Sequence, residues 1–163
     1  MNPRNQSTGA PAALAARHLE AENAQDVEGA TAVFTEDCVY RIPALGIDLR
    51  GRAALASHHA EMFATFPDWS NEEFELYEAP GRAFARIRVG RTHSREWGPF
   101  AATGKRIVTH SLAEFPLAAD GLLAAEIVHL NPLEALCQIG VVPTENAAEL
   151  AAAYRRLREA AAG

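Results

Sequence analysis

The sequence is poor in the residues that mark disulfide-rich and zinc-binding proteins. It has only two cysteines in 163 residues, Cys38 and Cys137, and neither has a cysteine or histidine partner at metal-ligand spacing. We therefore predict no metal, and we expect two reduced, buried thiols in a cytoplasmic protein.

Long apolar runs and an excess of basic residues are also lacking. No apolar run approaches the ~20 residues that span a bilayer, so no membrane partner is expected. The net charge is −6 and no basic stripe is present, which argues against a nucleic-acid partner. The sequence has no glycine-rich phosphate loop, HExxH motif or nucleophile elbow, so we predict no cofactor.

The composition that remains, 48% hydrophobic and 22% charged, is typical of a globular domain. Residues 1–11 are polar and contain glycine and proline, which predicts a disordered leader rather than a signal peptide. We predict one domain over residues 12–142, followed by a helical extension over residues 143–163.

The spacing of hydrophobic residues predicts that helices dominate the first part of the chain and strands the second. Helices are expected over residues 12–22, 26–34 and 52–66, the second capped by Asp26 and the third ended by Pro67. Strands are expected over 38–42, 74–79, 83–92, 106–115 and 122–130, with a loop over 46–51 and helices over 133–139 and 144–161. This segregation predicts an α+β domain. The last helix either covers the open end of the fold or docks on a second subunit.

Three short segments, in order, carry a resemblance to a known family. They are NAQD (23–26) with FTEDCVY (34–40), then Thr92-His93-Ser94 through Thr103-Gly104, and the closing Gln138-Ile139-Gly140. Over about residues 12–142 the chain resembles the SnoaL-like polyketide cyclases of the nuclear transport factor 2-like superfamily. The resemblance implies a cone-shaped, curved antiparallel or mixed sheet, with the three N-terminal-half helices on its concave face and an extra C-terminal helix. It also implies an apolar cavity, a small hydrophobic ligand and a homodimer.

The chain departs from the family at positions where relatives carry acids. The base that ketosteroid isomerases place before a proline on the first strand falls at Ile42. The last-strand aspartate of cyclases and epoxide hydrolases falls at Val128, and Asn131 replaces an acidic residue that usually begins the closing segment. These losses keep open a non-catalytic binding or assembly protein of the same fold.

Two polar residues match positions that relatives use. Tyr40 shares the strand face of Ile42, where epoxide hydrolases of this fold hold a water with a tyrosine; the alternative is a core tyrosine. His18 falls where ketosteroid isomerases carry an oxyanion-binding tyrosine. A histidine there could donate to an enolate or move a proton; the alternative is a half-exposed helix histidine.

Glu114 is the predicted acid or base, and His110 is its predicted hydrogen-bond partner. Glu114 follows Val108, His110 and Leu112 at period two, so all four are expected on one face. If that face lines an apolar cavity, desolvation should raise the pKa of Glu114. The alternative is an exposed carboxylate at the end of a strand.

The predicted substrate-binding residues are mostly apolar: Ile42, His59, Met62, Phe66, Trp97, Glu126 and Val128. Arg86 and Arg88 alternate with aliphatic residues, which favours the outside of the sheet and a dimer interface over the cavity. Together these features favour a cofactor-independent cyclase, isomerase or dehydratase acting on a hydrophobic, polyketide-like carbonyl compound. In it Glu114 and His110 move protons, while Tyr40 and His18 hold the oxyanion.

Overall fold

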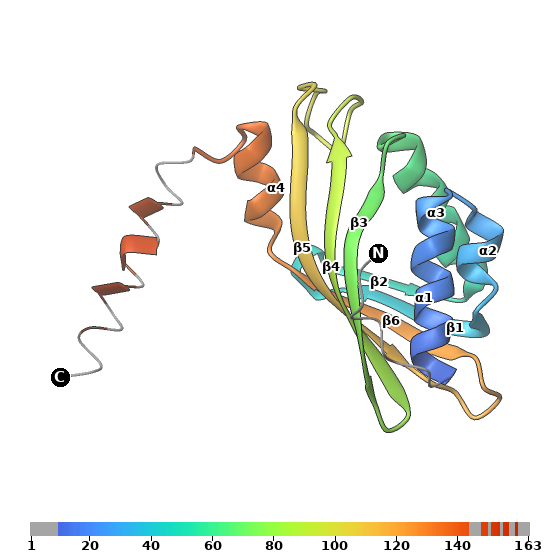
Figure 1. The fold of residues 1–163 in the computed structure, drawn as a ribbon. Helices are drawn as coiled ribbons and strands as arrows, with labels where there is room; N and C mark the ends of the chain where they lie inside the picture. Colours follow the sequence, from blue (N-terminus) through green and yellow to red (C-terminus); the bar gives the residue numbers. More distant parts are fainter. Residues whose placement is uncertain (1–9, 144–147, 150, 154, 157–158, 160–163) are drawn as a thin grey trace.

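Helices and strands occupy separate layers in the computed structural model (Figure 1). The structure describes residues 10–143, 148–149, 151–153, 155–156 and 159. The elements are α1 (Ala10–Asn23), α2 (Val27–Thr31), β1 (Phe34–Ile42), the 3-10 helix η1 (Pro43–Leu45), β2 (Ile47–Arg50), α3 (Arg52–Thr65), β3 (Ser70–Ala79), β4 (Arg82–Thr92), β5 (Arg106–Pro116), β6 (Leu123–Leu130) and α4 (Pro132–Ile139).

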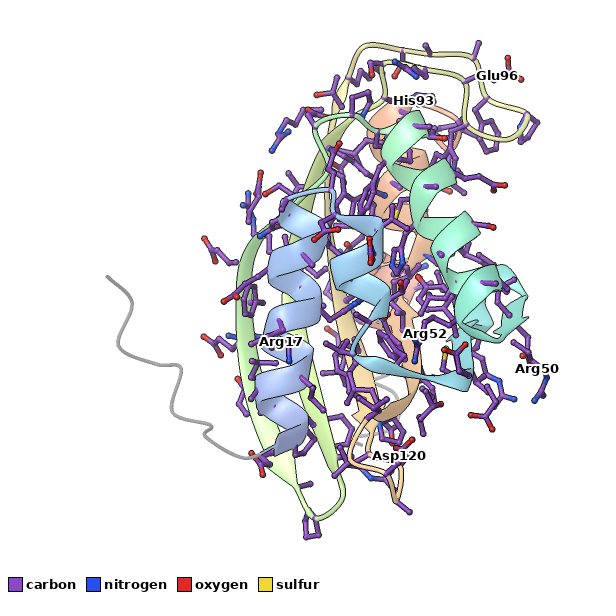
Figure 2. The ribbon with its side chains drawn as sticks, turned by 90° about the vertical axis from the view of Figure 1, so that its right-hand side faces the viewer. Arg17, Arg50, Arg52, His93, Glu96 and Asp120 are labelled. Carbon is purple, nitrogen blue, oxygen red and sulfur yellow. The ribbon has the colours of Figure 1, made fainter. Side chains whose placement is uncertain are left out.

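One curved, mixed sheet organises the fold. Its strand order is β2-β1-β6-β5-β4-β3. The β1–β6 pair is parallel and the other neighbours are antiparallel. Helix α1 packs on β3, β4 and β5, α3 packs on β1 and β2, and α2 contacts both helices. All three cover the sheet from the same side (Figures 1 and 2), which confirms the predicted α+β architecture.

The core lies between these helices and the inner face of the sheet. On β4 the residues at odd positions from Ala83 to Val89 are buried, whereas Arg82 and Arg86 are exposed. Phe34, Leu19 and Phe115 are fully buried in the same core. Burying each such side chain stabilises the fold by about 1.5–3 kcal/mol. Arg17 of α1 and Arg50 of β2, both labelled in Figure 2, are exposed to solvent.

Two predicted element boundaries near the N-terminus were wrong. Asp26 caps α2 as expected, its Oδ1 accepting from the Gly29 N–H at 2.9 Å, but the helix ends at Thr31 rather than Phe34. Phe34 instead begins β1, because it pairs with Leu123 of β6. Long-range strand pairing here overrides the local helical pattern.

The predicted loop over residues 46–51 contains a strand. Gly46, with φ of 67°, reverses the chain after η1, a conformation that glycine adopts without strain. The next four residues form β2, antiparallel to β1, with Ile47 and Leu49 half-buried and Asp48 and Arg50 exposed. Apolar and polar residues alternate in this part of the sequence, but the alternation is short, so the segment was predicted as a loop.

The closing Gln-Ile-Gly motif covers an open part of the sheet. Strand β6 pairs only with residues 111–114 of β5, which leaves the earlier part of β5 without a strand on that side. Helix α4 lies there instead. Gln138 accepts from the Val108 N–H through Oε1 (2.8 Å) and donates to the Val108 carbonyl through Nε2 (2.7 Å). Glu134 Oε2 accepts from the His110 N–H at 2.8 Å.

Residues 1–9 of the predicted leader and most of the predicted helix 144–161 lie outside the described residues, whereas Ala10 and Pro11, which were assigned to the leader, begin α1. Within the part of the chain that is described, none of the helices combines the length and the apolar character needed to cross a membrane.

Candidate functional site

A cavity of about 340 Å³ lies between the helices and the inner face of the sheet. Its wall is largely apolar and aromatic, with Ile42, Met62, Phe66, Trp97 and Val128 among the residues that line it. The polar groups lining it include Glu22, Tyr40, Asn71, Arg91, Thr109 and Glu126. An apolar pocket with a few convergent polar groups is the usual form of a small-molecule site.

His18 is the centre of a buried charged cluster beside this cavity. Its Nδ1 lies 2.8 Å from the carbonyl oxygen of Ala30. A carbonyl only accepts hydrogen bonds, so Nδ1 must carry a proton. On the other side of the ring, Nε2 lies 3.1 Å from Glu126 Oε2 and 3.6 Å from Glu22 Oε1. His18 is fully buried and does not line the cavity itself, so it acts on the cavity through these two carboxylates.

Glu22 is held from three directions. It lies one helical turn after His18 on α1, so both side chains share one face of that helix. Asn71 of β3 donates from Nδ2 to Glu22 Oε2 at 2.8 Å, and His59 Nε2 of α3 lies 3.0 Å from Oε1. Glu22 is only 6% exposed and His59 is fully buried. The carboxylate therefore ties α1 to α3 and β3.

These contacts set the charges in the cluster. Burial disfavours the charged form of His18, but the carboxylates of Glu126 and Glu22 outweigh it and raise the pKa of His18 to about 9. Burial likewise disfavours the Glu22 anion, yet His18, His59 and Asn71 lower the pKa of Glu22 to about 2. Near neutral pH, His18 is positive and Glu22 is negative.

Tyr40 lies close to the same carboxylates. It is 6% exposed and lines the cavity on β1. Burial, and then the negative charges of Glu126 and Glu22, raise the pKa of Tyr40 well above its ordinary value. Its phenol therefore keeps its proton and is available as a hydrogen-bond donor.

Three of these residues have the chemistry of a metal site. His18, Glu22 and His59 bring possible ligand atoms within 4.8 Å of one another. A metal, however, needs an unprotonated nitrogen. Nδ1 of His18 faces a carbonyl, and the raised pKa places a second proton on Nε2. In this protonation state the three residues form a buried ion-pair cluster.

A cationic group lies elsewhere in the cavity wall. Arg91, at the end of β4, is 6% exposed, and burial lowers the pKa of its guanidinium to about 10. Its guanidinium carbon lies 5.2 Å from the ring centre of Phe66, 5.1 Å from that of Trp69 and 5.9 Å from that of Trp97. Its Nη1 donates to Thr109 Oγ1 at 2.9 Å. The cavity therefore has an acidic region and a cationic region.

Glu114 and His110 lie outside the cavity, contrary to the prediction. Glu114 forms an ion pair with Arg82, and His110 Nδ1 lies 3.6 Å from Glu134 Oε2. The inward residues of β5 are the odd-numbered ones, including Thr109 and Ser111, which line the cavity. Successive strand residues point to opposite faces, so an error of one position moves a whole set of side chains to the wrong side.

Other predicted positions have mixed outcomes. His59 is fully buried and does not line the cavity, but it contacts Glu22, which does. Its neighbour His58 lines the cavity, and the ring centre of His58 lies 4.9 Å from that of Tyr40. Arg86 and Arg88 lie on the outer face, where Arg86 pairs with Glu75 at 2.9 Å and Arg88 pairs with Glu72.

Sequence reasoning missed Glu22, Asn71 and Arg91 as site residues. A signal existed for two of them. Glu22 follows His18 by four residues on a predicted helix, and Arg91 continues the inward alternation of Ile87 and Val89. Asn71 lies just before the predicted start of its strand, at residue 74, so only the fold shows that it reaches Glu22.

Solved structures share this architecture at low sequence identity. A candidate polyketide cyclase from Xanthomonas campestris pv. campestris superposes with a TM-score of 0.74 and 22% identity over 80% of this chain and 97% of that chain. A candidate hydroxylase from Streptomyces galilaeus gives 0.72 and 23% over 84% and 100%. A candidate ketosteroid isomerase from Kribbella flavida DSM 17836 gives 0.58 and 19% over 75% and 78%. These likenesses establish the fold.

No functionally curated protein matches the chain. The family model of the SnoaL-like domain matches residues 15–126, a span that runs from α1 to the buried carboxylate of β6. This match covers more than half of the sequence and agrees with the conical fold. The chain therefore belongs to the SnoaL-like domain family.

Proposed function

We propose that the protein is a cofactor-independent acid–base enzyme that removes a proton beside the carbonyl group of a hydrophobic, polyketide-like substrate. Ring closure, isomerisation or loss of water would follow from the resulting enolate. The observation that supports this most directly is the Glu126 carboxylate, which lines an apolar cavity between a protonated histidine and a protonated tyrosine. The polyketide-cyclase names of structural neighbours suggest the substrate class.

Glu126 is the proposed base. Its Oε2 is buried and lies 3.1 Å from the protonated Nε2 of His18, and it has no other hydrogen-bond partner among the described residues. Glu22, by comparison, is engaged by His18, His59 and Asn71, and its pKa is lowered to about 2, so it is a weak base. Glu126 also shares the inward face of β6 with Val128, so it supplies a carboxylate two residues before the family position.

Tyr40 is the proposed oxyanion donor. Its protonated phenol lies on the strand next to Glu126, so the α-carbon of a substrate can face the base while its carbonyl oxygen accepts a hydrogen bond from the phenol. A donor placed where charge develops stabilises the transition state more than the ground state. His18 lies behind Glu126 and is a positioning residue: its positive charge orients the carboxylate and offsets the negative charge of the site.

The proposal is tested by proton exchange at carbon. The wild-type protein is incubated in D₂O with 2-tetralone, a bicyclic ketone with acidic α-protons, and deuterium incorporation is followed by NMR. We expect exchange above the buffer rate, and Glu126→Gln should lower the enzymatic rate by roughly 10²–10⁴-fold, the usual contribution of a general base. Glu114→Gln is the matched control, because that carboxylate lies on the outer face and should leave the rate unchanged.

A non-catalytic binding protein is the second candidate. Ile42 and Val128 both line the cavity as apolar residues at positions where relatives carry acids, which favours it. This alternative predicts that bicyclic ketones bind without exchange above buffer, and that Glu126→Gln alters neither binding nor the exchange rate. Equal rates in the wild type and Glu126→Gln would therefore overturn the proposed enzyme.

A further inference from the structure

Arg91 is a buried cation with no acidic partner. Its side chain is 6% exposed, and none of the ion pairs formed among the described residues includes it. The other arginines of β4, by contrast, all pair with glutamates on the outer face: Arg82 with Glu114, Arg86 with Glu75 and Arg88 with Glu72. Burying an unpaired guanidinium is unfavourable, so the position calls for a balancing anion.

The guanidinium presents one free edge. Nη1 is occupied by Thr109 Oγ1, and the faces of the group lie near the rings of Phe66, Trp69 and Trp97. Nε is buried and has no hydrogen-bond partner among the described residues, and no hydrogen bond within that part of the chain uses Nη2. Nε–H and one Nη–H form the parallel fork that binds a carboxylate through both oxygens.

Arg91 lines the same cavity as the acidic cluster. Arg91, Glu22, Tyr40 and Glu126 all line that cavity. Asn71, which binds Glu22, is the register partner of Val89, two residues before Arg91 on β4. Two strand residues span ~7 Å, which is comparable to a fused pair of aromatic rings. The rings of Phe66, Trp69 and Trp97 supply flat apolar surface beside the cation.

We propose that the ligand of this cavity is a planar aromatic or conjugated carboxylic acid, whose carboxylate binds the free edge of Arg91 while its ring system extends toward Glu126 and Tyr40. This inference names the class of ligand for the site described above. It rests on the proposed function for one point, that the ring end of the ligand is the end that reacts at Glu126 and Tyr40. The cation determines the orientation of the ligand, because the carboxylate end binds at Arg91. The acidic cluster repels a second carboxylate at the other end of the ligand. A neutral ester or amide of the same shape leaves the guanidinium unbalanced and should bind less tightly.

The test compares 2-naphthoic acid with 2-naphthamide, which match in shape and differ in charge. Trp69 and Trp97 are the two tryptophans of the chain and both lie next to Arg91, so quenching of intrinsic fluorescence reports binding directly, with calorimetry as a check. We expect the acid to bind the wild-type protein roughly 10–100-fold more tightly than the amide, as for charge-assisted hydrogen bonds.

Variants of two arginines on the same strand assign the preference. Arg91→Met should bring the two affinities together, and Arg91→Lys, which keeps the charge without the fork, should retain part of the difference. Arg86→Met is the matched control on the outer face and should behave like the wild type. Circular dichroism melting verifies that each variant is folded, and Arg91→Lys keeps the test valid if Arg91→Met does not fold.

Three outcomes would overturn the inference: equal affinities in the wild type, a preference that survives Arg91→Met, or no binding of either compound. Glu126→Gln separates this inference from the proposed function, since it should lower the rate of proton exchange as stated above and keep the preference for the acid. An Arg91-dependent preference without any exchange would overturn the enzyme alone. Exchange without the preference would overturn only the carboxylate ligand.

Discussion

Tyr40 and Glu126 are register partners on the parallel strands β1 and β6, and both side chains line the cavity. This pairing joins a residue near the start of the chain to one near the end of the domain. It places a protonated phenol beside a carboxylate whose other neighbour is the imidazolium of His18. The proposed donor and the proposed base thus sit side by side, and their placement is fixed by strand register rather than by a flexible loop.

Removing the phenol should affect the reaction more than binding. Tyr40→Phe keeps the ring and its packing but loses the proposed donor to the oxyanion. We expect the rate of 2-tetralone exchange to fall by roughly 10²–10³-fold, the effect of losing one oxyanion donor, with the affinity for 2-naphthoate nearly unchanged. Exchange kinetics and fluorescence titration measure the two quantities separately. An equal loss of affinity and rate would instead indicate that Tyr40 serves binding alone.

The raised pKa of His18 should make the protein less stable in alkali. Its pKa of about 9, against an ordinary value of 6.5, means that the folded state holds this proton more tightly than the unfolded state. The stabilisation is fully present below pH 6.5 and is lost as the pH rises through 9. The loss is on the order of 3 kcal/mol in the free energy of unfolding, as a shift of this size implies. Urea unfolding between pH 6 and 10 measures it.

Two variants separate His18 from other groups that titrate in this range. His18→Asn should flatten the pH dependence between 6.5 and 9, whereas His110→Gln, at an exposed histidine of the outer face, should leave it as in the wild type. A wild-type free energy of unfolding that stays constant over this interval would contradict the buried imidazolium. The lowered pKa of Glu22 acts in the opposite direction, so its stabilisation is present above pH 4.5 and is lost as the pH falls toward about 2.

Gln138 should be needed to protect the backbone amides of β5 from hydrogen exchange in the part of the strand that does not pair with β6. Gln138→Met keeps the length of the side chain but removes both hydrogen bonds to the Val108 backbone. We expect the free energy of unfolding to fall by about 1–2 kcal/mol. Amide hydrogen exchange should accelerate at Val108 more than at Ala113, which pairs with β6. Unchanged protection at Val108 would show that the motif has another role.

We expect a homodimer formed through the outer face of the sheet, and light scattering at micromolar concentration tests it. Leu112 lies on that face on β5, one of the central strands, and is 44% exposed. Leu112→Glu should shift a dimer to a monomer because a charge at an apolar contact is costly to bury. Arg17→Glu, on the exposed face of α1 in Figure 2, should leave the mass unchanged. A monomeric wild type would overturn this prediction.

The elements were predictable where their patterns are long. Helix α3 and strands β4, β5 and β6 lie within one or two residues of the predicted spans, because each repeats its period over eight or more residues. The errors fall on the short elements α2 and β2 and on the starts of β1 and β3, which begin at Phe34 and Ser70 rather than at the predicted residues 38 and 74. There, pairing of Phe34 with Leu123 and of β2 with β1 outweighs the local preference.

The candidate site was predictable only in part. The apolar wall, including Met62, Phe66 and Trp97, was found because large hydrophobic residues of this kind line a cavity or a core wherever they fall. The wrong face was assigned to Glu114 and His110 because both faces of β5 mix apolar and polar residues. Their partners on the outside, Arg82 and Glu134, are distant in sequence.

The sequence by itself determined the α+β architecture and the family, since periodicity, turn residues and short motifs act over a few neighbouring positions. The tertiary structure alone decided which charges meet. His18, Glu22, His59, Asn71 and Glu126 come from four elements, and apart from the pairing of His18 with Glu22 along α1 no local pattern states their distances. The strength of a buried ion pair, and hence the pKa of each group, depends on separation and burial together, and both are fixed only when helices and sheet close around the cavity.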